Sequence, residues 1–142
     1  MHDLNNKIAI VTGGTRGLGR AIALSLARLG ATVAMNYRRD EASAAKTLDE
    51  VRAIAPRSIL IKADLEDDAQ VRAMVTRAAS ELGGLDILIA NAAATAFKPL
   101  LETKPHNLAR TFALSVNGFV AAVQEANKVM RDGGREIGRA HV

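Results

Sequence analysis

The chain has 142 residues, of which 49% are apolar and 24% charged, and it contains no cysteine and no tryptophan. This balance is typical of one globular domain and excludes a disordered chain, a collagen-like repeat and a disulfide scaffold. The net charge of +4 comes from scattered residues, and only three Phe and one Tyr could stack on bases, so we expect no nucleic-acid partner.

Short apolar runs and amphipathic segments alternate four times along the chain. Strands are predicted at 7–12, 32–36, 58–61 and 86–90, and helices at 18–29, 41–54, 69–82 and 105–130. The strands are continuous apolar runs, which is typical of strands covered on both faces. Right-handed crossovers through the helices then predict an α/β fold with a doubly wound parallel sheet.

A glycine-rich turn joins the first predicted strand to the first predicted helix. Gly13 permits the tight turn, Gly17 lets the backbone approach a pyrophosphate at the helix N-terminus, and Gly19 allows close packing of the helix on the strand. A phosphate loop of the NTPase type is excluded, because no Gly-Lys-Ser/Thr follows. The alternative is a glycine-rich turn without a ligand. The candidate cofactor-binding residues of the turn are Gly13, Thr15, Arg16, Gly17, Leu18 and Gly19.

The spacing Thr-Gly-x-x-x-Gly-x-Gly resembles that of the short-chain dehydrogenase/reductase family, and the resemblance extends over residues 7–135. It implies a Rossmann-type sheet. Asp64 and Leu65 follow the third strand, where the family places an Asp near the adenine ring. Asn91, Ala92 and Ala93 follow the fourth strand, in the place of a second family motif. Asn117, in Ser-Val-Asn-Gly, occupies the place of the family's catalytic asparagine.

The end of the second strand indicates which nicotinamide cofactor is bound. An acidic residue there would favour NAD, but the chain has Arg38 and Arg39, and Arg16 approaches from the glycine turn. Arginine can donate two parallel hydrogen bonds to a phosphate, so we expect NADP (NADPH). The alternative is that these arginines are solvated loop charges. Tyr37 lacks a Tyr-x-x-x-Lys context and is expected to pack beside the adenosine.

The resemblance implies hydride transfer between NADPH and a carbonyl or enoyl (acyl) substrate, catalysed by Ser, Tyr, Lys and Asn. Of these four catalytic residues, only the asparagine has a counterpart in this sequence, Asn117, so the chain is expected to be inactive alone. Two alternatives remain. Asn117 is a core residue with satisfied hydrogen bonds or a surface residue, or the whole chain is a non-catalytic nucleotide-binding module. No residue spacing suggests a metal site.

The resemblance also implies that the full-length protein is a homo-oligomer. No run of about 18 apolar residues and no apolar leader occur, so we expect a cytoplasmic protein without membrane association.

Residues 136–142 (EIGRAHV) lack a strand pattern, because Gly138 and Arg139 interrupt it. One set of codons for them, GAG ATC GGA AGA GCA CAC GTC, contains the start of a widely used sequencing adapter. We therefore expect 1–135 to be the N-terminal part of a nucleotide-binding domain and 136–142 to be a non-native tail. The sheet is expected to be truncated after the fourth strand and its long helix, with 86–90 as an exposed edge.

Overall fold

The computed structural model describes residues 3–93 and 98–138. Its five strands are β1 (Ile8–Val11), β2 (Thr32–Tyr37), β3 (Ile59–Lys62), β4 (Leu85–Ala90) and β5 (Met130–Gly138). Its helices are α1 (Gly17–Arg28), α2 (Glu41–Arg52), α3 (Asp68–Leu82), α4 (Pro105–Phe112) and α5 (Gly118–Val129), with a 3₁₀ turn η1 (Leu100–Glu102) and a π-helical segment η2 (Ala113–Asn117). The predicted alternation of strands and helices is confirmed.

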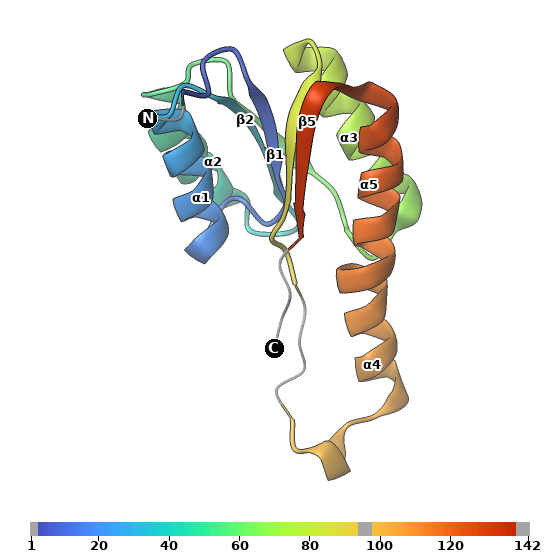
Figure 1. Ribbon diagram of the computed structural model, residues 1–142. Helices are drawn as coiled ribbons and strands as arrows, with labels where there is room; N and C mark the ends of the chain where they lie inside the picture. Colours follow the sequence, from blue (N-terminus) through green and yellow to red (C-terminus); the bar gives the residue numbers. More distant parts are fainter. Residues whose placement is uncertain (1–2, 94–97, 139–142) are drawn as a thin grey trace.

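All five strands are parallel and lie in the order β3-β2-β1-β4-β5. Helices α1 and α2 cover one face of the sheet, and α3 and α5 cover the other (Figure 1). Strand β1 is buried at every position, and its side chains alternate between the two cores: Ile10 packs with α3 and α5, whereas Val11 packs with α1 and α2. Burial on both faces explains why the strands have continuous apolar runs.

The predicted long helix 105–130 is divided. Helix α4 leads through η2 into α5, and together they form one rod that extends well beyond the sheet (Figure 1). The rod ends at Val129 rather than at Met130. A π-helical turn inserts an extra residue into the helical repeat, so the side chains after it are rotated about the rod axis relative to those of an uninterrupted α-helix.

The expectation of a sheet truncated after the fourth strand is wrong, because β5 pairs in parallel with β4. Arg135 lies opposite Ile87 and Gly138 lies opposite Ala90, so the predicted bare edge is covered along most of its length. Backbone N–H and C=O groups form such a ladder, and a side-chain pattern is therefore no precondition for an outer strand. Gly133, with a φ of +80°, adapts the beginning of this strand.

The buried carboxylate of Asp86 connects both ends of the described chain. Asp86 accepts a hydrogen bond from the Ile8 backbone N–H at 2.8 Å, pairs with Arg131 at the beginning of β5, and lies 3.6 Å from the Lys7 ammonium. Burial raises the pKa of Asp86, but the hydrogen bonds from Arg131 and Ile8 and the two positive charges outweigh it and hold the pKa below its ordinary value. Asp86 is therefore ionised at neutral pH.

Candidate cofactor-binding site

The carboxyl ends of β1, β2 and β4 surround a cavity of about 760 Å³. In open parallel sheets this is the edge at which ligands bind. Of the predicted cofactor-binding residues, all except Asp64 line it: Gly13, Thr15, Arg16, Gly17, Leu18, Gly19, Tyr37, Arg38, Arg39, Leu65, Asn91, Ala92 and Ala93. The fold thus brings together segments that are distant in the sequence.

The glycines of the turn are required for two different reasons, backbone conformation and close packing. Gly13 and Gly17 have φ values of +59° and +51°, which non-glycine residues rarely adopt. A Cβ at Gly19 would lie 2.0 Å from the Gly13 carbonyl oxygen, so a side chain there cannot be accommodated without movement of the backbone. Gly17, by contrast, has no atom within 4 Å of such a Cβ, so its outer side is open. These are the properties of a cradle that a pyrophosphate could approach.

Thr12 and Asn91 hold this turn against the end of β4. The Thr12 hydroxyl accepts hydrogen bonds from the backbone N–H groups of Asn91 and Ala92, both at 3.0 Å. The Asn91 side-chain amide donates to the carbonyl oxygens of Thr12 (3.0 Å) and Gly13 (3.4 Å). Asn91 is buried, so its amide shapes the turn from behind. No role for Thr12 was predicted from the sequence.

Asn36, at the end of β2, also lines the cavity and was not predicted. Its side-chain oxygen accepts from the Gly13 backbone N–H at 3.2 Å, and its amide donates to the Ala63 carbonyl oxygen at 3.1 Å. It therefore joins the ends of β1, β2 and β3. A buried polar residue at the end of an otherwise apolar strand is the signal that could have identified it.

Four arginines line the cavity, and they differ in their partners. The Arg38 Nε and Nη1 atoms lie 3.0 Å from carboxylate oxygens of Asp64 and Glu66, respectively. Arg110 of α4 also pairs with Glu66, at 2.8 Å. Within the part of the chain that the structure describes, Arg16 and Arg39 form no ion pair. Asp64 thus lies behind Arg38 and not on the cavity wall.

A second cavity of about 240 Å³ lies between the sheet and α5 and shares wall residues with the first. Thr12, Ala92 and Phe119 contribute to its lining, and Ser115 of η2 contributes a hydroxyl group. Asn117, two residues later, is exposed and lines neither cavity. The catalytic role expected for Asn117 therefore stays a prediction.

Within residues 3–93 and 98–138, no group of three or more His, Cys, Asp or Glu side chains could hold a metal ion. None of the helices described is long and apolar enough to cross a lipid bilayer.

Comparison with known proteins gives consistent matches. The family model for short chain dehydrogenases matches residues 7–139. A 1-cyclohexenylcarbonyl-CoA reductase from Streptomyces collinus is 40% identical over 131 residues, which are 92% of this chain and 47% of that protein. A hydroxynaphthalene reductase from Aspergillus fumigatus is 36% identical over 134 residues, covering 94% of this chain and 49% of that protein.

Two similar solved structures contain a bound cofactor. A short chain dehydrogenase from Burkholderia cenocepacia in complex with NADP has a TM-score of 0.92 and 37% identity, covering 95% of this chain and 55% of the other. A blue fluorescent protein from a metagenomic library in complex with NADPH has a TM-score of 0.91 and 39% identity, covering 96% and 56%. The chain thus spans about half the length of the proteins it matches.

Proposed function

Because the chain belongs to the short-chain dehydrogenase family, we propose that the complete protein is an NADPH-dependent oxidoreductase. It would act on a carbonyl or enoyl group of a small-molecule substrate. The single observation that carries the proposal is the cavity in which the glycine turn, the Arg38–Arg39 segment and the Asn91–Ala93 segment meet. The reductases and NADP complexes among the similar proteins support it.

The residues present fit a dinucleotide. The open outer side of Gly17 and the N-terminus of α1, which carries no acidic residue in its first turn, would receive the pyrophosphate. Arg16, Arg38 and Arg39 would surround the ribose phosphate, with Tyr37 and Leu65 beside the adenosine. When bound, NADPH supplies the hydride. This chain orients that cofactor and excludes water from its buried side.

The resemblance implies a tyrosine as the proton donor with a lysine four residues later, whereas this sequence contains one tyrosine, Tyr37, and no Tyr-x-x-x-Lys. This chain offers two candidates for holding a water or substrate oxygen. They are Asn117, because of the resemblance, and Ser115, because of its position. We infer that the chain alone does not catalyse reduction. Because one set of codons for residues 136–142 contains an adapter sequence, we also propose that this segment is not native. Sequencing of the genomic locus tests this proposal.

An assay of the full-length gene product tests the function. We expect oxidation of NADPH in the presence of some carbonyl or enoyl thioester compounds. The decrease of NADPH absorbance measures this oxidation. Binding of NADPH without turnover of any substrate, together with a gene that lacks Tyr-x-x-x-Lys, would identify a nucleotide-binding module instead. Failure to bind NADPH or NADH would contradict both assignments.

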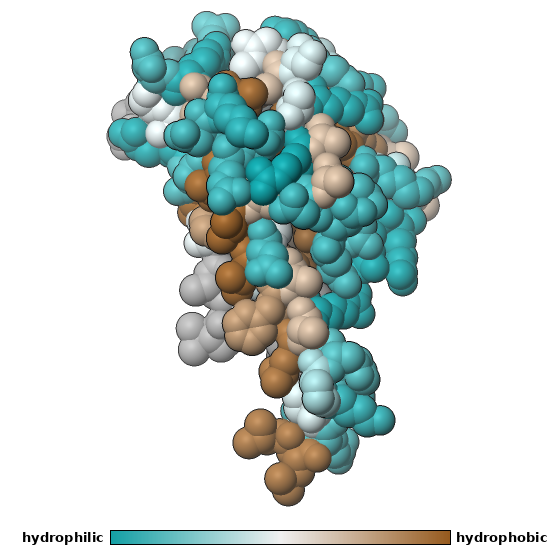
Figure 2. All heavy atoms as spheres, turned by 90° about the vertical axis from the view of Figure 1, so that its right-hand side faces the viewer, coloured by the Kyte–Doolittle hydropathy of each residue, from teal (hydrophilic) through white to brown (hydrophobic). Residues whose placement is uncertain are grey.

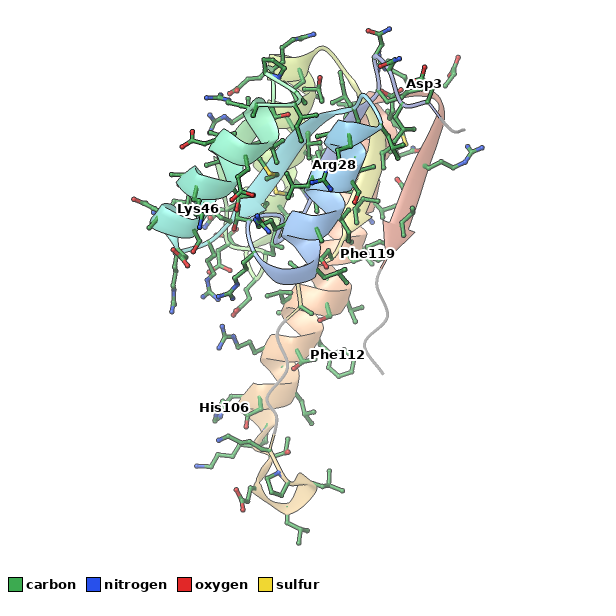
Figure 3. All side chains as sticks on the ribbon, turned by 90° about the vertical axis from the view of Figure 1, so that its left-hand side faces the viewer. Asp3, Arg28, Lys46, His106, Phe112 and Phe119 are labelled. Atoms are coloured by element: carbon green, nitrogen blue, oxygen red, sulfur yellow. The ribbon has the colours of Figure 1, made fainter. Side chains whose placement is uncertain are left out.

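We further propose that the full-length protein is a cytoplasmic homo-oligomer that pairs along the α4–α5 rod. The exposed apolar side chains at steps of four residues are Leu108, Phe112, Val116 and Val120. Figure 2 shows apolar residues along one side of the rod and at its tip, and Phe112 projects from it below the sheet in Figure 3. A Phe112→Glu variant should dissociate the oligomer in sedimentation measurements, whereas Lys46→Glu on α2 should not.

A further inference from the structure

Helix α4 presents one side to the larger cavity and yet buries none of its side chains. Asn107, Arg110 and Thr111 line the cavity, and Leu114 continues this row in η2. Steps of three and four residues place these four side chains on one side of a helix. The helix extends beyond the sheet (Figure 1), and none of its residues is buried. Helix α4 is therefore a wall of the cavity that no hydrophobic core holds in place.

The rod is fixed to the body of the molecule at its α5 end. A Cβ at Gly118, the first residue of α5, would lie 2.7 Å from the Leu65 carbonyl oxygen, so the rod passes the segment after β3 in close contact. The buried residues of the rod begin at Gly118. The π-helical segment η2 lies between this fixed end and α4, and π-helical turns are frequent at functional sites.

One ion pair ties α4 to the same segment after β3. Arg110 donates from Nε to a Glu66 carboxylate oxygen at 2.8 Å, and Arg38 donates to that oxygen at 3.0 Å. Across residues 3–93 and 98–138, no other hydrogen bond or ion pair joins a side chain of α4 to a part of the chain outside 104–112. The Arg110–Glu66 pair therefore holds the cavity-lining side of α4 toward the body of the protein.

We propose that Arg110 is a positioning residue for the cofactor. Through Glu66 it holds α4 as a movable wall of the cavity, and it thereby slows dissociation of the bound dinucleotide. This inference rests on the proposed NADPH-binding function. Because Glu66 follows Leu65, which is placed beside the adenosine above, the wall stands at the adenosine end. Release requires α4 to turn outward about η2, and this movement breaks a single ion pair whose arginine side chain is 53% exposed.

Stopped-flow measurement of NADPH dissociation from the full-length protein tests the proposal. Arg110→Gln should raise the dissociation rate about threefold, the effect of losing one partly exposed ion pair. Arg110→Lys, which keeps the charge, should restore most of the wild-type rate. In a Glu66→Gln background, Arg110→Gln should have no further effect, because its partner is already absent. This comparison cancels any direct effect of the Glu66 charge on the cofactor.

Hydrogen exchange of the backbone amides of 105–112 measures the wall itself. NADPH should slow this exchange in the wild-type protein and should slow it less in Arg110→Gln. Equal protection by NADPH in the two proteins would show that Arg110 does not hold α4, and would overturn the proposal.

Arg72→Gln is the matched control, because Arg72 of α3 also pairs with the rod, at 3.7 Å from Glu125 of α5, but lines neither cavity. It should leave the dissociation rate unchanged, and an increase equal to that of Arg110→Gln would indicate a general loosening of the rod and overturn the proposal. An unchanged rate in Arg110→Gln would also overturn it. An undiminished effect of Arg110→Gln in the Glu66→Gln background would show that Arg110 acts on the cofactor directly. Wild-type protein that binds no NADPH overturns the proposed function itself, whereas the other contrary outcomes overturn only the role of Arg110.

Discussion

The two ends of this molecule are constructed differently. Around the glycine turn, polar side chains such as Thr12, Asn36 and Asn91 are buried and joined by hydrogen bonds to backbone groups of other strands. Along the α4–α5 rod, by contrast, large apolar side chains are exposed. The buried polar groups at the cofactor end therefore have hydrogen-bond partners, whereas the exposed apolar side chains of the rod agree with the oligomer contact proposed above.

The largest expected effect is at the cofactor end. Gly19→Ala should lower the free energy of unfolding by about 3 kcal/mol and abolish NADPH binding, because the new Cβ would overlap the Gly13 carbonyl oxygen. Urea denaturation and calorimetry measure the two losses.

Gly17→Ala is the informative counterpart to that variant. Its Cβ meets no neighbour, so only the strain of a positive φ, about 1–2 kcal/mol, should remain. Equal losses of unfolding free energy in Gly17→Ala and Gly19→Ala would contradict the view that close packing distinguishes the two positions.

The next effect concerns the connection between β1 and β4. Thr12→Val removes the acceptor of two backbone N–H groups and should cost about 1–2 kcal/mol in urea denaturation. Thr12→Ser keeps the hydroxyl and serves as the control. A Ser variant as unstable as the Val variant would show that packing of the methyl group, and not the hydroxyl, stabilises the turn.

A kinetic comparison examines the region where the rod meets the cavities. If the full-length protein has the proposed activity, Ser115→Ala should lower kcat about tenfold, because one hydrogen bond to a reacting or water oxygen would be lost. Asn117→Ala should lower kcat less than Ser115→Ala does, since Asn117 lies outside both cavities. The KM for NADPH should stay constant in both variants. The reverse order of effects would restore the role expected for Asn117 from the sequence.

The smallest effect is a dependence of stability on pH. Because the folded-state pKa of Asp86 lies below the unfolded value of about 3.9, its stabilisation is complete above that pH and is lost as the pH falls through the folded pKa. Asp86→Asn should flatten the acid limb of a plot of unfolding free energy against pH. If the acid limb has the same slope in Asp86→Asn as in the wild type, other carboxylates cause the acid sensitivity.

Most of the sheet could be predicted from the sequence, because strands buried on both faces need apolar residues at every position. The fifth strand could not be predicted, because Arg135 and Gly138 pair with β4 through their backbones and this pairing leaves no apolar pattern in the sequence. The glycine turn was predictable because its backbone conformation and packing demand glycine. The partners of Arg38 could not be predicted, because Asp64 and Glu66 become its neighbours only when β2 and β3 pair. The π-helical turn that contains both Ser115 and Asn117 likewise left no sign in the helical periodicity.

The position of Asp86 has a consequence for how the chain folds during synthesis. The backbone N–H of Ile8 obtains its acceptor from a residue 78 positions later, and that acceptor is paired in turn with Arg131. A nascent chain that has only its first strands outside the ribosome therefore lacks the carboxylate that accepts a hydrogen bond from the first residue of β1. At a later stage it still lacks the cation that neutralises this carboxylate. The last polar connection of the sheet can form only after residue 131 has emerged.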